Sequence, residues 1–214
     1  GIVEAAARNG ISLFIDPHQD VWSRWTGGDG APMWTLEAVG FDPSKLHASG
    51  AALLHQEMGA LYPEMQWFSN HLRLGCATMF TLFFAGDDYA PGITAEGRPI
   101  QEYLQEHYFE AFAVLAKRIA SHDNVVGFGS MNEPGEGFIG INDVSAPRSD
   151  MLLPGLAPTP WEAMCAGEGF ETSANRIAIK GLGLRPLERV PLGTKGVRAW
   201  KEGEVCVWRR VGLW

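Results

Sequence analysis

The sequence lacks a basic excess and any long apolar run, and both absences exclude classes of protein. The 214-residue chain has a formal net charge of −8, whereas a nucleic-acid partner requires a basic face that neutralises phosphates. No run reaches the roughly 18 consecutive apolar residues that are needed to cross a bilayer. We therefore predict neither a nucleic-acid partner nor a membrane span.

Cysteine is also scarce. Cys76, Cys165 and Cys206 are widely spaced and form no Cys-x-x-Cys pair or metal-finger pattern. The N-terminal residues show no signal-peptide or transit-peptide pattern. We expect reduced thiols and a cytoplasmic location, while the sequence leaves the oligomeric state undetermined.

The residues that are present predict an α/β protein. With 46 % hydrophobic residues the chain can bury a substantial core. Residues 2–9 favour a helix ended by Asn9-Gly10, and the short apolar run "ISLFID" that follows is typical of a buried parallel strand. Apolar stripes predict helices over about 67–84 and 99–121, and the strand 125–131 follows. Helix, strand, helical crossover and strand form the pattern of a parallel βαβ unit.

The remainder of the chain carries weaker signals. Residues 140–214 show scattered Gly, Pro and charge, so we expect an irregular excursion there, with a β-like stretch "EVCVWRRV" near Val205. A (β/α)₈ barrel typically takes about 250 residues. Only two inner strands are well supported here, so residues 1–214 are predicted to be part of such a barrel or a different α/β arrangement.

Two polar strand ends are the candidate site. The strand "VVGFGSM" ends on Asn132 and Glu133, and a carboxylic acid at the tip of a buried strand is partly desolvated, as a general acid requires. Glycoside hydrolysis uses such an acid together with a hydrogen bond to the sugar 2-hydroxyl, which Asn132 could supply. The alternative is that Asn-Glu-Pro only caps the following turn.

The other strand end places His18 and Asp20 at the same predicted sheet edge as Glu133. These side chains could orient a hydroxylated ligand or form half of a metal site, since His and carboxylates are common ligands. Strand-end capping is the alternative. The sequence also has eight tryptophans. Most are expected to pack in the core or loops, although sugar-binding sites also use such rings.

Three stretches carry a resemblance to a known family: "LFIDPHQDVWSRWTGGDGAPMWTLEAVG", "ATMFTLFFAG" and "VVGFGSMNEPGEGF". They resemble the endoglycoceramidase-related branch of glycoside hydrolase family 5, whose fungal members cleave glucose from glucosylceramide or steryl glucosides. The resemblance is strongest over residues 1–138.

The resemblance implies a TIM barrel whose third and fourth strands are "LFIDPHQD" and "VVGFGSMNEP". It implies that Glu133 is the acid/base, that Asn132 holds the sugar 2-hydroxyl, and that His18 and Asp20 line the same subsite. The reaction would be retaining, on a small-molecule glycoside or glycolipid, with no metal and no organic cofactor.

The family nucleophile lies on a seventh strand that we do not find, so we expect it to be absent from this chain. None of the later glutamates ends an apolar strand: Glu162, Glu168, Glu171, Glu188, Glu202 and Glu204. The leading interpretation is an incomplete chain of a glycosidase that would be inactive alone. The alternatives are a truncated paralogue that at most binds sugar or a partner chain, and a metal-dependent barrel hydrolase using His18, Asp20 and Glu133.

Overall fold

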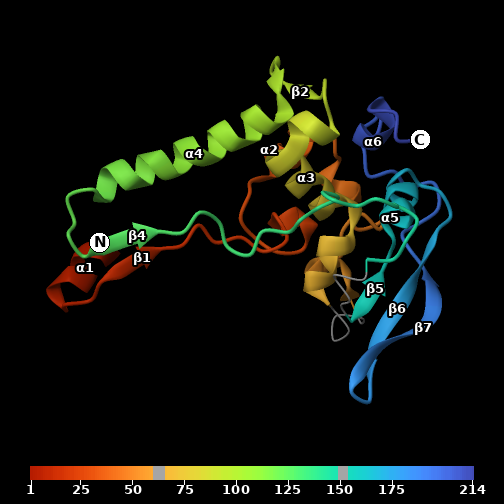
Figure 1. Ribbon diagram of the computed structural model, residues 1–214, viewed down its shortest axis with the longest axis horizontal. Coiled ribbons are helices and arrows are strands. Elements are labelled where there is room, and N and C mark those ends of the chain that lie inside the picture. Colours follow the sequence, from red (N-terminus) through yellow and green to blue (C-terminus); the bar gives the residue numbers. More distant parts are fainter. Residues whose placement is uncertain (60–65, 149–153) are drawn as a thin grey trace.

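The computed structural model describes residues 1–59, 66–148 and 154–214 (Figure 1). The helices are α1 (Ile2–Arg8), α2 (Met33–Val39), α3 (Leu74–Tyr89), α4 (Ile100–Ile119), α5 (Pro160–Gly167) and α6 (Val207–Arg210). The strands are β1 (Leu13–Ile15), β2 (Thr94–Ala95), β3 (Arg98–Pro99), β4 (Val125–Phe128), β5 (Gly155–Ala157), β6 (Ser173–Lys180) and β7 (Gly183–Pro191). Short 3₁₀ helices cover Arg24–Thr26, Pro43–Lys45, His55–Glu57 and Trp67–Leu72.

The predicted parallel βαβ unit is confirmed. β1 pairs with β4 in parallel, with Leu13 opposite Val125 and Ile15 opposite Phe128. The long helix α4 leads directly into β4, as its apolar periodicity predicted, and Asn9 is the C-cap of α1. Strand β4 ends at Phe128 rather than at Met131. The unit extends to one side of the molecule, away from the main body (Figure 1).

The prediction that both strands are fully buried is wrong. Phe14 of β1 is 63 % exposed and Val126 of β4 is 66 % exposed. Each strand has only the other as a partner in this two-stranded sheet, so few side chains cover its faces. Within the described residues no closed barrel is seen, and the observed unit is a partial α/β arrangement.

The main core surrounds α3 instead. Of the 16 residues of α3, 11 are buried. Residues 74–83 are enclosed on all sides and not along the single stripe that the periodicity predicted, whereas Asp87 and Asp88 in the last turn are exposed. The enclosing side chains come from both halves of the chain. The Trp208 indole Nε1 donates to Thr78 Oγ1 at 3.0 Å, and the Phe138 amide donates to Thr81 Oγ1 at 2.7 Å.

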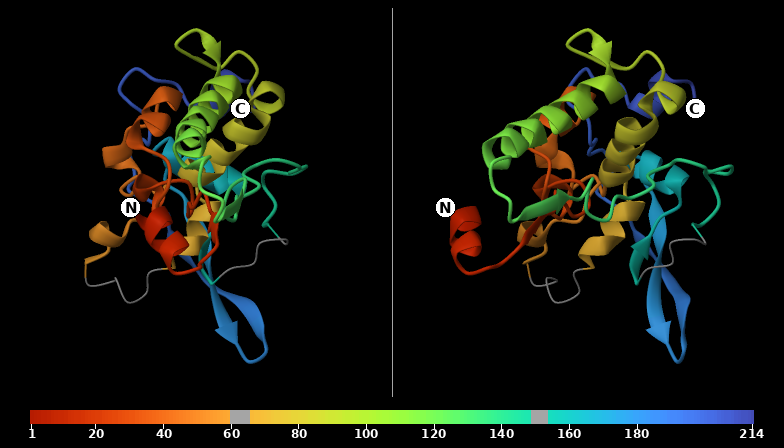
Figure 2. Two further views of the ribbon diagram at one scale, coloured as in Figure 1. Left: turned by 90° about the vertical axis from the view of Figure 1, so that its left-hand side faces the viewer. Right: turned by 60° about the vertical axis from the view of Figure 1, so that its left-hand side comes forward.

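The prediction of an irregular segment over residues 140–214 holds for residues 140–148, which form no helix or strand, and is wrong from Gly155 to Pro191, where regular elements form; residues 149–153 lie outside the described residues. Strands β5, β6 and β7 form an antiparallel sheet whose β6–β7 hairpin extends from the body (Figure 2). Gly181 has a φ of +62° at the two-residue turn, a conformation that favours glycine.

The stretch around Val205 is not a strand, because the chain turns into α6 at Val207. This helical turn buries Cys206, Val207 and Trp208 together against the core. A strand would have pointed successive side chains to opposite faces and exposed one of them.

The described helices include none whose length and apolar character would allow it to cross a bilayer.

A stacked aromatic pair joins the two halves of the core. The rings of Phe41 and Trp200 lie 4.2 Å apart at an interplanar angle of 13°. The Asp42 amide donates to the Ala199 carbonyl at 2.8 Å beside them. Residues near 40 and 200 therefore form one packing unit.

We predict that Phe41→Ala lowers the free energy of unfolding by about 3–5 kcal/mol, because it opens a cavity under Trp200. Phe14→Ala is the matched control and should change it by less than about 0.5 kcal/mol, because Phe14 is largely exposed. Urea unfolding followed by tryptophan fluorescence measures both. Equal losses for the two variants would contradict the position of the core described here.

Candidate active site

The two polar strand ends meet at one edge, as predicted. Beyond the strands the parallel hydrogen bonding continues, since the Gly129 amide donates to the Ile15 carbonyl at 2.8 Å. The Asn132 amide likewise donates to the Pro17 carbonyl at 3.1 Å. The backbone therefore holds the segment around His18 next to the segment around Asn132 and Glu133.

Gln19 connects these two segments. Its Nε2 donates to the Asn132 carbonyl at 2.5 Å and to the Glu133 carbonyl at 3.2 Å. Its Oε1 accepts from the Trp22 amide at 2.9 Å, and the side chain is buried. Sequence reasoning assigned no role to Gln19. Its position between His18 and Asp20 could have indicated this role. Alternate residues of an extended segment point to opposite sides, so Gln19 is expected to point away from the side that His18 and Asp20 share.

Asn132 uses one end of its side-chain amide to hold the site together. Its Nδ2 donates to the Gln19 carbonyl at 3.0 Å, and a carbonyl can only accept, which fixes the orientation of the amide. Oδ1 accepts no hydrogen bond from the described part of the chain. Asn132 therefore offers an acceptor to a hydroxyl.

His18 lies between two carboxylates. Its Nδ1 is 3.2 Å from Asp16 Oδ2, and its Nε2 is 3.4 Å from Asp20 Oδ2. The hydrogen bond to Asp16 is the main cause that raises the pKa of His18 above its ordinary value, with Asp20 adding to it. Since the protonated form is favoured, His18 is a donor at both nitrogens over a wider pH range than a free histidine.

Asp29 completes a small acidic group beside His18. A two-way backbone bridge pairs Asp20 with Asp29, and a Cβ at Gly28 would overlap the Asp20 carbonyl, so this turn requires glycine. Ligand atoms of His18, Asp20 and Asp29 all lie within 4.8 Å of one another. The three could hold a cation or several sugar hydroxyls. The metal-dependent alternative predicted Glu133 as the third ligand, and the structure groups Asp29 there instead.

Glu133 is exposed, so the predicted desolvation of its carboxyl is wrong for the described structure. The physical reason is the uncovered sheet, which leaves the strand tip in contact with solvent. The backbone of Glu133 has a φ of +33°, and Val21 and Trp22 at the other strand end have φ of +43° and +80°. Such conformations are costly for residues other than glycine and cluster at functional sites.

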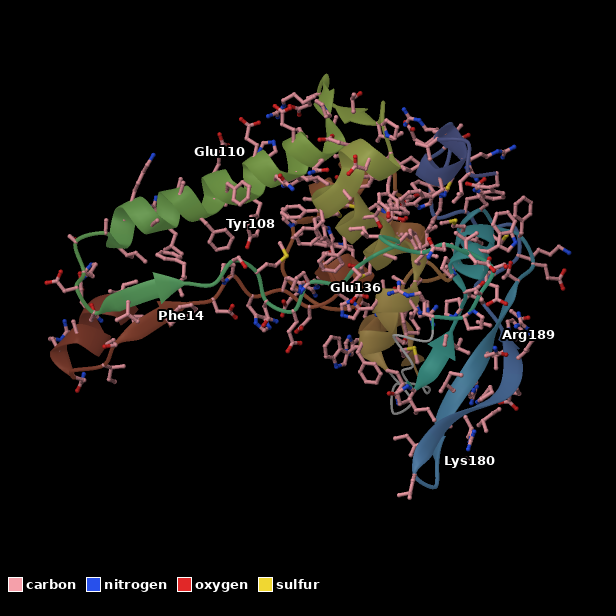
Figure 3. The ribbon with its side chains drawn as sticks, in the orientation of Figure 1. Phe14, Tyr108, Glu110, Glu136, Lys180 and Arg189 are labelled. Atoms are coloured by element: carbon pink, nitrogen blue, oxygen red, sulfur yellow. The ribbon has the colours of Figure 1, made fainter. Side chains whose placement is uncertain are left out.

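An apolar cavity of about 430 Å³ opens beside the strand ends. Its lining includes His18 and Gln19, and α4 contributes Tyr108, which extends toward the strands while Glu110 points away from them (Figure 3). The Tyr108 hydroxyl donates to the Ser130 carbonyl at 2.5 Å. The remaining lining is mainly aromatic or aliphatic: Trp22, Trp34, Phe83, Leu104, Phe112 and Met131.

Four of the six later glutamates form ion pairs with basic side chains. Glu162 caps the N-terminus of α5 and pairs with Arg189, and Glu168 is buried against Arg198 at 2.9 Å. Glu171 pairs with Lys195, and Glu188 pairs with Arg176. None of these four carboxylates pairs with a residue of the two strand tips.

The chain is homologous to fungal enzymes that are glycosidases. A glucosylceramidase of Aspergillus fumigatus is 37 % identical over 239 residues, which include all of this chain and 31 % of that protein. The ergosteryl-beta-glucosidase of Saccharomyces cerevisiae is 34 % identical over 249 residues, covering 98 % of this chain and 33 % of the enzyme. No family model matches the chain.

Solved structures give the same relationship. The crystal structure of Cryptococcus neoformans sterylglucosidase 1 with hit 1 superimposes with a TM-score of 0.93 at 36 % identity, over all of this chain and 34 % of that one. The same enzyme with tris gives a TM-score of 0.88 at 38 % identity. The chain thus spans about a third of the length of the relatives it matches.

We predict that Asp16→Asn lowers the pKa of His18 toward its ordinary value, because the largest cause of the upward shift is removed. Asp20→Asn should also lower the pKa of His18, because Asp20 contributes to the same upward shift. Because the pKa of His18 is higher in the folded protein than in the unfolded chain, its pairing with the carboxylates stabilises the fold fully at pH values below the pKa of the unfolded chain. This stabilisation is lost as the pH rises through the pKa of the folded protein. NMR titration of the His18 ring protons measures the shift. Asp87→Asn is the control. If it changed the pKa of His18 as much as Asp16→Asn does, Asp16 would not be the cause of the upward shift.

We predict that Gln19→Leu lowers the free energy of unfolding by about 2–3 kcal/mol, because it leaves the carbonyls of Asn132 and Glu133 and the amide of Trp22 without their partner. Gln56→Leu is the control at an exposed position and should change it by less than about 0.5 kcal/mol. Urea denaturation gives both values. An unchanged stability for Gln19→Leu would show that the two strand ends do not depend on this side chain.

Proposed function

We propose that this chain is the acid/base-carrying part of a retaining β-glucosidase of glycoside hydrolase family 5, acting on a glycolipid such as glucosylceramide or a steryl glucoside. The parallel pairing of β1 with β4 carries the proposal, because it brings His18 and Asp20 to the same edge as Asn132 and Glu133. Homology to fungal glucosylceramidases and steryl glucosidases supports it. In the complete enzyme β1 and β4 would be the third and fourth strands of a (β/α)₈ barrel.

Glu133 would act twice. It first protonates the glycosidic oxygen, so that the leaving group departs as an alcohol, and then removes a proton from the water that releases the sugar. The second carboxylate must lie about 5–5.5 Å away to form the covalent intermediate. We place that nucleophile outside this chain. Further covering of the strand tip would desolvate Glu133 and suit it to the acid role.

The neighbouring groups would hold the sugar. Asn132 Oδ1 accepts a hydrogen bond from the 2-hydroxyl, since its Nδ2 is bound to Gln19. His18 and Asp20 offer a donor and an acceptor to further hydroxyls. The aromatic cavity beside His18 is suited to the apolar part of a glycolipid, because it removes apolar surface from water. No step of this scheme uses a metal or an organic cofactor.

Glu133→Gln, made in the longest natural polypeptide that carries this sequence, tests the proposal. Turnover of an alkyl glucoside, whose leaving group needs protonation, should fall roughly 10²- to 10⁴-fold. Turnover of a dinitrophenyl glucoside should fall much less in its first step, because that leaving group departs without a proton. Glu110→Gln, at an exposed position of α4 that points away from the strands (Figure 3), is the control and should leave both rates unchanged.

Equal losses on the two substrates would argue against Glu133 as the acid. Folded wild-type protein that binds glucosides but turns over neither substrate would instead favour the non-catalytic paralogue.

A further inference from the structure

A second cavity, of about 730 Å³, lies apart from the strand tips. Its walls come from the loop at residues 47–53, the 3₁₀ helix Trp67–Leu72 and the β5–β6–β7 sheet. These segments are distant in sequence and meet only in the folded chain. The proposed glycosidase mechanism uses none of them.

Arg73 lines this cavity and is a buried cation. It is 3 % exposed, and its Nη1 donates to the Gly50 carbonyl at 3.0 Å. Its Nε is buried without a hydrogen-bond partner, and no described carboxylate forms an ion pair with it. Burial lowers the pKa of Arg73 to about 10, so the side chain still carries its charge at neutral pH. An unpaired buried charge is costly to the fold and calls for an anion.

Ser69 lies one helical turn before Arg73 and provides a second polar group in the same wall. The residue is 1 % exposed, and its Oγ is buried and has no hydrogen-bond partner. Buried hydroxyls are nearly always hydrogen-bonded in folded proteins. Two residues of one cavity wall, Arg73 and Ser69, therefore carry hydrogen-bonding groups that the protein leaves unsatisfied.

The charge of the lining favours an anion. Among the described lining residues there is no Asp or Glu, whereas Arg73, Arg176 and His47 are present, in a chain of net charge −8. Arg176 is held by Glu188 at 3.5 Å, outside the lining. His47 Nδ1 accepts from the Leu54 amide at 3.1 Å, so a neutral His47 carries its hydrogen on Nε2 and remains a donor.

The opposite wall of the cavity is apolar. The sheet contributes Leu156 from β5, Ile177 and Ile179 from β6, and Val190 from β7. A volume of this size accommodates a small organic molecule rather than a single ion. The site thus combines a charged end with an apolar side.

We propose that this cavity binds an anionic amphiphile, a small molecule with one oxyanion group and an apolar body. The oxyanion contacts Arg73 and Ser69, because a guanidinium donates two parallel hydrogen bonds to such a group. The apolar body lies against the β5–β6–β7 sheet. The site is independent of Glu133 and of the proposed glycosidase activity.

Calorimetric titration with hexyl phosphate, below its micelle concentration, tests the proposal on the longest natural polypeptide that carries this sequence. Inorganic phosphate and hexanol are the two half-probes, and each should bind at least roughly tenfold more weakly than hexyl phosphate. Arg73→Gln should weaken hexyl phosphate binding by roughly tenfold or more. Arg185→Gln is the matched control, since Arg185 is exposed on β7 outside the lining.

Ser69→Ala gives a second variant if Arg73→Gln does not fold, because it removes a hydroxyl that has no partner in the protein. It should keep the stability and weaken hexyl phosphate binding several-fold. Wild-type protein that does not prefer hexyl phosphate to hexanol would overturn the proposal, as would equal binding by wild type and the Ser69→Ala and Arg73→Gln variants. Glucosidase rates of these variants, measured separately, distinguish failure of this site from failure of the proposed function.

Discussion

Residues 74–83 of α3 are buried on every side of the helix, and the rest of the chain must supply the segments that enclose them. The loop before it, the 3₁₀ helix Trp67–Leu72 and the C-terminal residues around Trp208 all bury their apolar side chains against it. Polar atoms on α3, such as Thr78 Oγ1 and Thr81 Oγ1, receive hydrogen bonds from the enclosing segments. Burial of α3 therefore brings residues 21–54 and 199–208 together.

The candidate active site depends on a different constraint, the parallel hydrogen bonding that continues past the ends of β1 and β4. Gln19 extends this connection by binding the carbonyls of Asn132 and Glu133. The positive φ angles of Val21, Trp22 and Glu133 show that the backbone is held in costly conformations where the two segments meet. A site with this much local strain is maintained by its surroundings.

The two cavities have complementary characters. The first has an aromatic lining next to His18, whose environment is acidic through Asp16, Asp20 and Asp29. The second has a buried cation and no described carboxylate in its lining. One is suited to hydroxyl groups with an apolar neighbour, and the other to an oxyanion with an apolar neighbour.

Local patterns in the sequence were sufficient for part of this structure. The helix stop at Asn9-Gly10, the apolar periodicity of α4 and the polar ends of β1 and β4 were all predicted, because capping, helical repeat and strand polarity depend on neighbouring residues. The parallel pairing then followed from the order of the elements. The roles assigned to His18, Asp20, Asn132 and Glu133 stay predictions.

Other features depend on contacts that no local pattern encodes. The exposure of Phe14 and Glu133 follows from the absence of neighbouring strands in the described sheet, and α6 forms where a strand was expected because Trp208 packs beside Thr78. Gln19 and Arg73 acquire their importance only from segments distant in sequence. The sequence by itself determined which segments are helical or extended and which polar residues end them. Tertiary structure alone decided which of those residues are buried or unpaired, because burial and pairing are set by partners that meet only on folding.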